Sequence, residues 1–109
     1  MWDVKNKNSA DISMIEGDFG LALPYSIVGF PVSPLDDIRI TVKTEKNGDA
    51  VVEKIFHADD EGTVELEFTE AESALLIPGN YLYTLDWYSD GVFMATIING
   101  AKLKVEDKV

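Results

Sequence analysis

The feature that most constrains the fold of this chain is a two-residue period in its hydrophobicity. In TVELEF (63–68) every second residue is apolar, and IRITVK (38–43) repeats the same alternation. Successive side chains of a β-strand point to opposite faces, so this period predicts antiparallel strands with one buried and one wet face. FGLAL (19–23) alternates apolar with small residues, and VVEKIF (51–56) is a less regular strand.

The predicted strand at 51–56 has two possible inward faces. Either Val52 with Phe56 or Val51 with Ile55 would point into the core, and the alternation does not choose between them.

Turn residues separate the strands. The pairs Asn47-Gly48 and Asp90-Gly91 predict type I′ hairpin turns, because these residues tolerate positive φ angles. ADDEG (58–62) is a polar turn. The stretch FPVSPLDD, broken by two prolines, predicts a crossing between sheets.

One segment, TEAESALL (69–76), is typical of a helix. Thr69 and Glu72 have the spacing of a capping box, and Pro78 with Gly79 ends the helix after about two turns. A helix of this length suits a crossover between strands.

The elements together predict the fold class. About seven short strands with regularly spaced turns indicate an all-β, immunoglobulin-like antiparallel β-sandwich with one short helical crossover at 69–76. A small closed barrel is the main alternative. We expect a single domain over residues 12–107, preceded by an N-terminal extension over residues 1–11.

Composition excludes several classes of partner. The 109 residues include 20 Asp and Glu against 9 Lys and Arg, which gives a net charge of -11. Phosphates and anionic lipids attract basic surfaces, so neither nucleic acid nor membrane is expected as a partner. The chain has no cysteine, which excludes disulfides and thiolate zinc sites.

The N-terminal sequence does not resemble a targeting signal. MWDVKNKNSADISM lacks a basic region followed by an apolar one, and no apolar run approaches the roughly 20 residues of a membrane span. With Met1 native, the product is expected to be made in the cytoplasm and to leave it only by lysis or within an assembled particle.

The last quarter of the chain predicts an aromatic hairpin. A two-residue turn at Asp90-Gly91 pairs Ser89 with Val92 and then, up the ladder, Tyr88 with Phe93, Trp87 with Met94, Leu85 with Thr96 and Tyr83 with Ile98. One face, predicted to be core, carries Tyr81, Tyr83, Leu85, Trp87, Met94 and Ile98. A bulge or kink is expected at Gly100, after which Ala101, Leu103 and Val105 point inward and Lys102 and Lys104 outward.

The opposite face of this hairpin is unusually apolar. It carries Asp86 but also the apolar residues Leu82, Tyr88, Phe93 and Ile97. One interpretation is that the N-terminal segment, with Trp2, Ile12 and Met14, or the 69–76 helix covers this face. The other is a protein–protein interface made by Leu82, Tyr88, Phe93 and Ile97, with Trp2 as an additional anchor.

Catalytic and metal-binding patterns are weak. His57 is the only histidine, and neither a zinc set nor a Ser-His-Asp arrangement can be assembled around it. Calcium ligands are conceivable at Asp59, Asp60 and Glu61 or at Asp36 and Asp37, but solvated turn acids explain both clusters. We therefore expect neither an enzyme nor a cofactor.

A sugar-binding platform is the remaining alternative of a different class. Trp2, Trp87 and Tyr88 are the aromatic residues available for stacking. Trp87, on the uncharged hairpin face, is more simply a core residue.

The order of motifs also resembles a known family. IEGDFGLAL (15–23), LDDIRITVKTEKNG (35–48) and the long segment from Gly62 to Val105 resemble the immunoglobulin-like modules of tailed-phage structural proteins. The likeness is to the N-terminal modules of baseplate upper proteins and to tail or fibre accessory proteins. It covers roughly residues 12–106 and includes Gly17-Asp18, the Thr-, Glu- and Ala-rich helical turn, Gly79, Tyr81, Tyr83, Asp90-Gly91 and Gly100.

The resemblance implies a non-enzymatic virion part. Such modules pack into rings or trimers, or attach to a larger tail or capsid protein. Residues 1–10 depart from the pattern, and no sequence follows Val109 where a fibre protein would continue, so a small stand-alone structural protein or one excised domain is expected. A carbohydrate-binding or calcium-dependent adhesion domain on a cell surface is the alternative.

Overall fold

The two-residue period produces seven strands and one short helix in the computed structural model, which describes residues 11–17 and 23–108. The elements, in chain order, are β1 (Ile12–Ile15), β2 (Leu23–Ser26), β3 (Asp37–Lys43), β4 (Ala50–Phe56), β5 (Thr63–Leu66), α2 (Glu70–Leu75), β6 (Gly79–Ser89) and β7 (Val92–Glu106). The predicted all-β sandwich with one helical crossover is confirmed.

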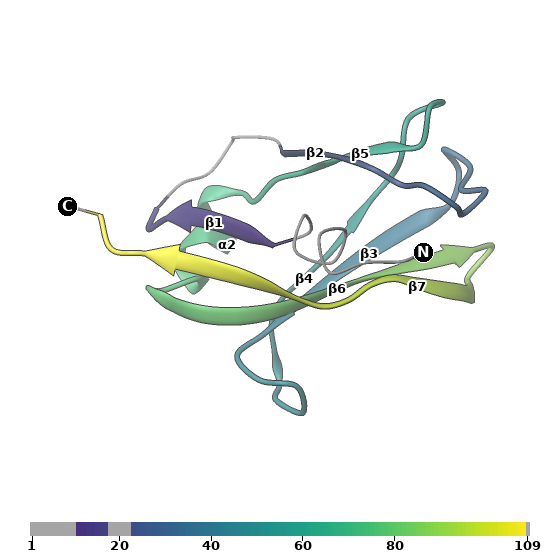
Figure 1. Ribbon diagram of the computed structural model, residues 1–109. Helices are drawn as coiled ribbons and strands as arrows, with labels where there is room; N and C mark the ends of the chain where they lie inside the picture. Colours follow the sequence, from purple (N-terminus) through teal and green to yellow (C-terminus); the bar gives the residue numbers. More distant parts are fainter. Residues whose placement is uncertain (1–10, 18–22, 109) are drawn as a thin grey trace.

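The strands form two sheets on opposite sides of the core (Figure 1). The larger sheet has the order β1-β7-β6-β3-β4, and β2 pairs with β5 in the smaller one. All pairs are antiparallel except β1 with β7, which are parallel, so the prediction of a purely antiparallel arrangement is wrong at this edge. The parallel pairing satisfies backbone groups of β7 from Leu103 to Glu106 that would otherwise form an open edge.

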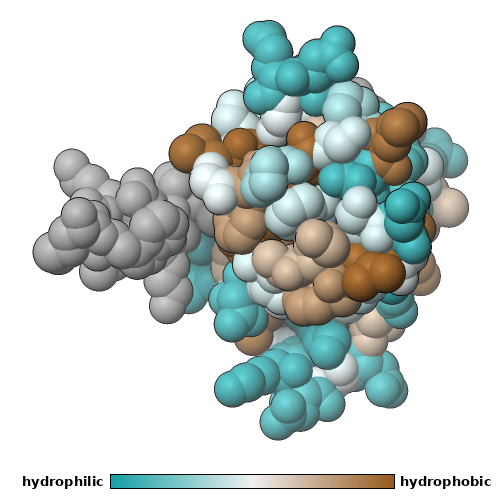
Figure 2. All heavy atoms as spheres, turned by 90° about the vertical axis from the view of Figure 1, so that its right-hand side faces the viewer, coloured by the Kyte–Doolittle hydropathy of each residue, from teal (hydrophilic) through white to brown (hydrophobic). Residues whose placement is uncertain are grey.

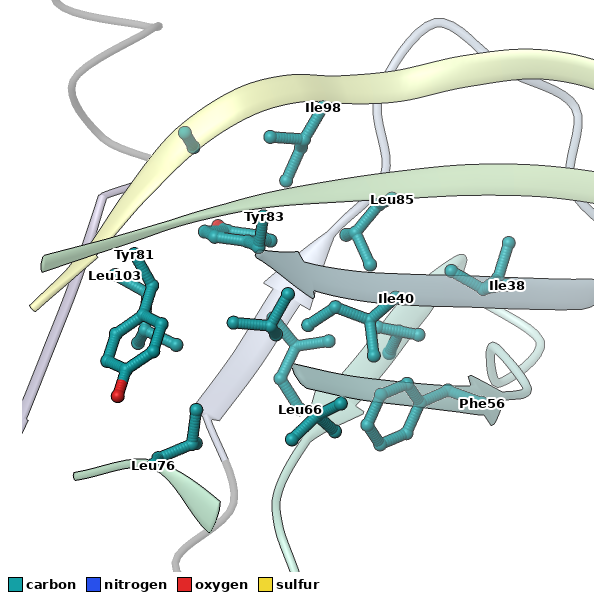
Figure 3. Close-up of a cluster of buried hydrophobic side chains, with 14 of the residues drawn as sticks. Ile38, Ile40, Phe56, Leu66, Leu76, Tyr81, Tyr83, Leu85, Ile98 and Leu103 are labelled. Carbon is teal, nitrogen blue, oxygen red and sulfur yellow. The ribbon is translucent and has the colours of Figure 1, made fainter. Parts of the chain in front are cut away.

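The core lies between the sheets and follows the alternation along each strand. Ile38, Ile40 and Val42 of β3 are at most 1% exposed, and Val64 and Leu66 of β5 face them from the smaller sheet. Figure 3 shows such side chains converging between the layers. On β4 the inward pair is Val52 and Phe56, with exposed fractions of 4% and 9%; Ile55 lies outward at 47%.

The predicted helical crossover is confirmed with its capping box. The Thr69 hydroxyl accepts from the Glu72 amide at 3.2 Å, and Glu72 accepts from the Thr69 amide at 2.8 Å. Lys54 of the edge strand β4 points inward and donates to Glu72 Oε1 at 2.9 Å and to the Glu67 carbonyl at 3.0 Å. Lys54 therefore attaches the crossover to the edge of the large sheet.

The β3–β4 connection differs from the predicted type I′ turn. Six residues, 44–49, join the strands, and neither Asn47 nor Gly48 has a positive φ. The Gly48 amide instead donates to the Glu45 carbonyl at 3.0 Å. Gly48 is thus the fourth residue of an ordinary turn, a position that also favours glycine. Of the predicted strand at 19–23, only Leu23 lies within the described residues.

Candidate interaction surface

The β6–β7 hairpin begins as the sequence predicts. Asp90 and Gly91 have φ angles of 51° and 76°, the positive values that a type I′ turn requires. Ser89 pairs with Val92 and Tyr88 with Phe93. The predicted turn and the first two rungs of the ladder are confirmed.

Beyond these rungs, three register shifts in β7 change which residues face the core. Trp87 pairs with Ala95, Leu85 with Ile98 and Tyr83 with Ala101, so Met94, Ile97 and Gly100 have no partner in β6. The predicted partners Met94, Thr96 and Ile98 for these three rungs are therefore wrong. The bulge predicted at Gly100, which has a φ of 75°, is confirmed.

The first two bulges reverse the expected facing of two residues. Met94, predicted to lie in the core, is 48% exposed. Ile97, predicted to lie on the contact face, packs against the core cluster instead. Each bulge adds one residue to β7, and one added residue turns the following side chains to the other face. The third bulge restores inward positions for Ala101, Leu103 and Val105, as predicted.

Two of the predicted contact residues form an aromatic pair on the outer face of the sheet. The rings of Tyr88 and Phe93 meet edge to face, with centroids 5.6 Å apart. The guanidinium of Arg39 lies 4.2 Å from the centre of the Tyr88 ring. Tyr88 is consequently half-buried, whereas Phe93 remains 53% exposed.

A loop from the other sheet is held against the same end of the hairpin. The Trp87 indole donates to Asp36 Oδ2 at 2.8 Å, and the Ser33 amide donates to the same oxygen at 3.0 Å. Phe30 packs edge to face on Trp87 at 6.2 Å. These contacts fix the β2–β3 loop, residues 27–36, beside the end of β6.

Trp87 is a core residue, as expected. It is 7% exposed, and its indole nitrogen is engaged with Asp36. The structure therefore offers no stacking platform for a sugar at Trp87.

Exposed apolar side chains gather at this end of the sandwich. Val28 and Leu35 of the loop are 83% and 90% exposed, and Val92 of β7 is 60% exposed. We call Val28, Leu35, Val92, Phe93 and Met94 the hairpin-end surface. Figure 2 looks onto this end: apolar groups in brown emerge across its middle, between polar loops above and below.

The structure separates the remaining predicted contact residues. Leu82 lies near the other end of β6, half-buried between Lys43 and Lys102 in the ladder. Trp2 lies outside the described residues. Ile12 and Met14 pack against the core, and Leu76 beside α2 is buried in it, so neither segment covers Tyr88 and Phe93 in the part that is described.

Four members of the hairpin-end surface escaped the sequence analysis. Val28 and Leu35 belong to a Pro-rich loop without periodicity, where nothing in the sequence indicates which side chains stay outside. Val92 and Met94 depend on the turn and on the first bulge. The signal available was the apolar run VFMA directly after a tight turn.

The polar candidates have structural roles. His57 Nδ1 donates to the Asp36 carbonyl at 3.0 Å, and Asp59 Oδ1 accepts from the amides of Glu61 and Thr63 at 2.8 and 2.9 Å. The Asp36 carboxylate accepts hydrogen bonds from the Trp87 indole and the Ser33 amide. Among residues 11–17 and 23–108, no group of three or more His, Cys, Asp or Glu side chains is placed to hold a metal ion.

Comparisons with known proteins add no family to this picture. No protein-family model matches the chain, and no curated protein matches it. Over the described part of the chain, no helix is long and apolar enough to cross a membrane.

Proposed function

We propose that this protein is a non-enzymatic structural module that acts through protein–protein contacts, as a tail, baseplate or fibre accessory component of a tailed phage or prophage. Its partners are further copies of itself or a larger phage structural protein. It is made in the host cytoplasm and retained in the virion. The hairpin-end surface provides one contact.

The observation that carries this proposal is the exposure of the hairpin-end surface. Five large apolar side chains at one end of the sandwich are between 48% and 90% exposed, in a chain with a net charge of -11. Apolar groups collected at one end of a soluble domain usually mark a contact surface. Burial of a side chain such as Val or Phe contributes about 1.5–3 kcal/mol.

The rigidity of the same end supports a binding role. The loop carrying Val28 and Leu35 is fixed through Asp36 and Trp87, and Val92 and Phe93 follow a tight turn at the end of two long strands. A surface held in place before binding loses less conformational entropy when a partner arrives. The virion assignment itself is supported by the resemblance of residues 12–106 to phage immunoglobulin-like modules.

The contact can be tested by light scattering at high salt, where charge interactions are screened and apolar contacts persist. At about 0.5 M NaCl the mass of the wild type should exceed 12.1 kDa as concentration rises. Val92→Asp and Phe93→Asp should abolish this increase. Ile77→Asp, at a residue 66% exposed outside the hairpin end, is the matched control and should leave it unchanged.

Two results would contradict this contact: a wild type that stays monomeric at high salt in the absence and presence of candidate phage proteins, or equal effects of Phe93→Asp and Ile77→Asp. The virion role has its own test. Particles purified from the producing strain should contain the chain in stoichiometric amounts, measured by quantitative mass spectrometry, and its absence from them would refute that role.

A further inference from the structure

A row of lysines crosses the outer face of the large sheet, far from the hairpin turn. Lys43, Leu82 and Lys102 are direct neighbours on β3, β6 and β7, and Lys104 follows beside Asn80 on the next outward rung. Lys46 of the β3–β4 loop borders the same area. We call Lys43, Lys46, Lys102 and Lys104 the basic strip. A shallow groove of about 680 Å³ runs between Lys46, Leu82, Lys102 and Lys104.

The basic strip is an exception in an acidic molecule. It contains four of the nine Lys and Arg residues of the chain. Three acids accompany it: Glu45 lines the groove, Glu106 lies 3.7 Å from Lys104, and Asp11 accepts from the Lys102 backbone amide at 3.0 Å. A positive excess remains, and the aliphatic parts of the lysines with Leu82 add apolar area.

The opposite layer carries the complementary charge. Residues 59–72 contain seven acids and no Lys or Arg. Six of them are exposed. Five of these six, on the 57–62 loop, on β5, just after β5 and at the start of α2, we call the acidic layer: Asp60, Glu61, Glu65, Glu67 and Glu70. Figure 1 shows β5 and the 57–62 loop at the top of the molecule and the β3–β4 loop at the bottom.

The edges of the large sheet at β7 and β4 do not favour assembly by strand addition. Three bulges interrupt the edge of β7, and β4 carries the inward Lys54 and an unpaired residue, Val51. Bulges and inward charges are the features by which edge strands resist pairing with another chain. The faces are therefore better suited than these two edges to contact a second copy.

We infer that the basic strip of one copy docks on the acidic layer of a second copy, head to tail. The two surfaces lie on opposite sides of the molecule, so each copy can engage a neighbour on both sides. Such a heterologous contact produces rings where the rotation closes and filaments where it does not. This inference rests on the proposed function in that it presumes assembly, but it uses a different surface from the hairpin end.

Charge-swap variants of the full chain test this contact by sedimentation velocity. In about 0.02 M NaCl the mass of the wild type should rise above 12.1 kDa as protein concentration increases. The part of this increase that comes from the charged contact should disappear at about 0.5 M NaCl. Lys102→Glu with Lys104→Glu should abolish the low-salt association. Glu65→Lys with Glu67→Lys should abolish it as well. All four side chains are exposed, and both variants should keep the wild-type circular dichroism spectrum.

The two variants also control for net charge. Each reversal changes the charge by two, so the lysine variant has a net charge of -15 and the glutamate variant -7. Simple repulsion would make the -7 variant associate more strongly than the wild type, whereas head-to-tail docking makes it associate less. An equimolar mixture should recover low-salt association, because each strip then meets a layer of opposite charge.

The outcomes separate this inference from the hairpin-end contact. A wild type that does not associate at low salt, a -7 variant that associates as strongly as the wild type, or a mixture that stays monomeric would each overturn it. Phe93→Asp removes association at high salt but should retain the salt-sensitive association. The charge-swap variants should lose the salt-sensitive association and retain association at high salt. Each of the two proposed contacts can therefore be refuted without the other.

Discussion

Asp36 is the residue that joins the β2–β3 loop to the hairpin. Asp36 is 6% exposed, and its carboxylate accepts hydrogen bonds from the Ser33 amide and the Trp87 indole. The Ser33 amide first and the indole second lower the pKa of this carboxyl; burial opposes them, and Ser89 adds to the lowering. The loop therefore depends on the charged form of one acid.

This dependence predicts a pH effect. The folded pKa of Asp36 lies below the unfolded value of about 3.9, so the ionised group stabilises the fold above that pH, and the contribution is lost as pH falls through the folded pKa. Asp36→Asn should be less stable than the wild type at neutral pH, and the difference should narrow below about pH 4. Urea unfolding followed by tryptophan fluorescence measures it. Asp60→Asn, in an exposed turn, is the control, and a pH-independent deficit in Asp36→Asn would exclude the ionic contribution.

At the scale of the element, β7 shows how bulges distribute residues between the two faces. Met94, Ile97 and Gly100 each shift the ladder by one residue. The first shift leaves Met94 exposed beside Phe93, and the third returns Leu103 and Val105 to the core. Strand β7 thus contributes to both the hairpin-end surface and the basic strip, and its register changes between the two contributions.

Gly100 gives this element its most direct test. Its φ of 75° disfavours a side chain, although a Cβ would meet nothing within 4 Å. Gly100→Ala should therefore lower the free energy of unfolding by about 1–2 kcal/mol through backbone strain alone. Gly100→Asn should lose less, because Asn tolerates this conformation. Equal urea midpoints for Gly100→Ala and the wild type would show that the bulge does not need the left-handed backbone.

At the scale of the whole molecule, the dominant property is the segregation of charge within a net of -11. The acidic layer covers one side of the sandwich, and the basic strip crosses the other. Excess charge of one sign opposes compaction, and salt screens this repulsion. Salt should therefore stabilise the folded chain while it weakens the contact between the basic strip and the acidic layer.

The effect of salt on folding can be measured at protein concentrations low enough to keep the chain monomeric in light scattering. The melting temperature should rise between about 0.02 M and about 0.5 M NaCl. The rise in melting temperature should be larger for Lys102→Glu with Lys104→Glu, which has a net charge of -15. It should be smaller for Glu65→Lys with Glu67→Lys, which has a net charge of -7. Identical increments for the three proteins would mean that net repulsion contributes little to stability.

Local patterns in the sequence determined many of the core positions, the hairpin turn and the start of the helix. Alternation placed Ile38, Ile40 and Leu66 in the core, Asp90-Gly91 set the hairpin turn, and Thr69 with Glu72 began the helix. Each of these depends on neighbours a few residues away, through strand pleat, backbone sterics or a cap.

Only the tertiary structure decided the facing of Met94 and Ile97, the six-residue β3–β4 loop and the exposure of Val28 and Leu35. It also placed the lysines of β3 and β7 on either side of Leu82. A bulge turns the side chains that follow it to the other face of the sheet. Its position depends on which residues of both paired strands must reach the core. This is a long-range property, and a local two-residue period does not predict it.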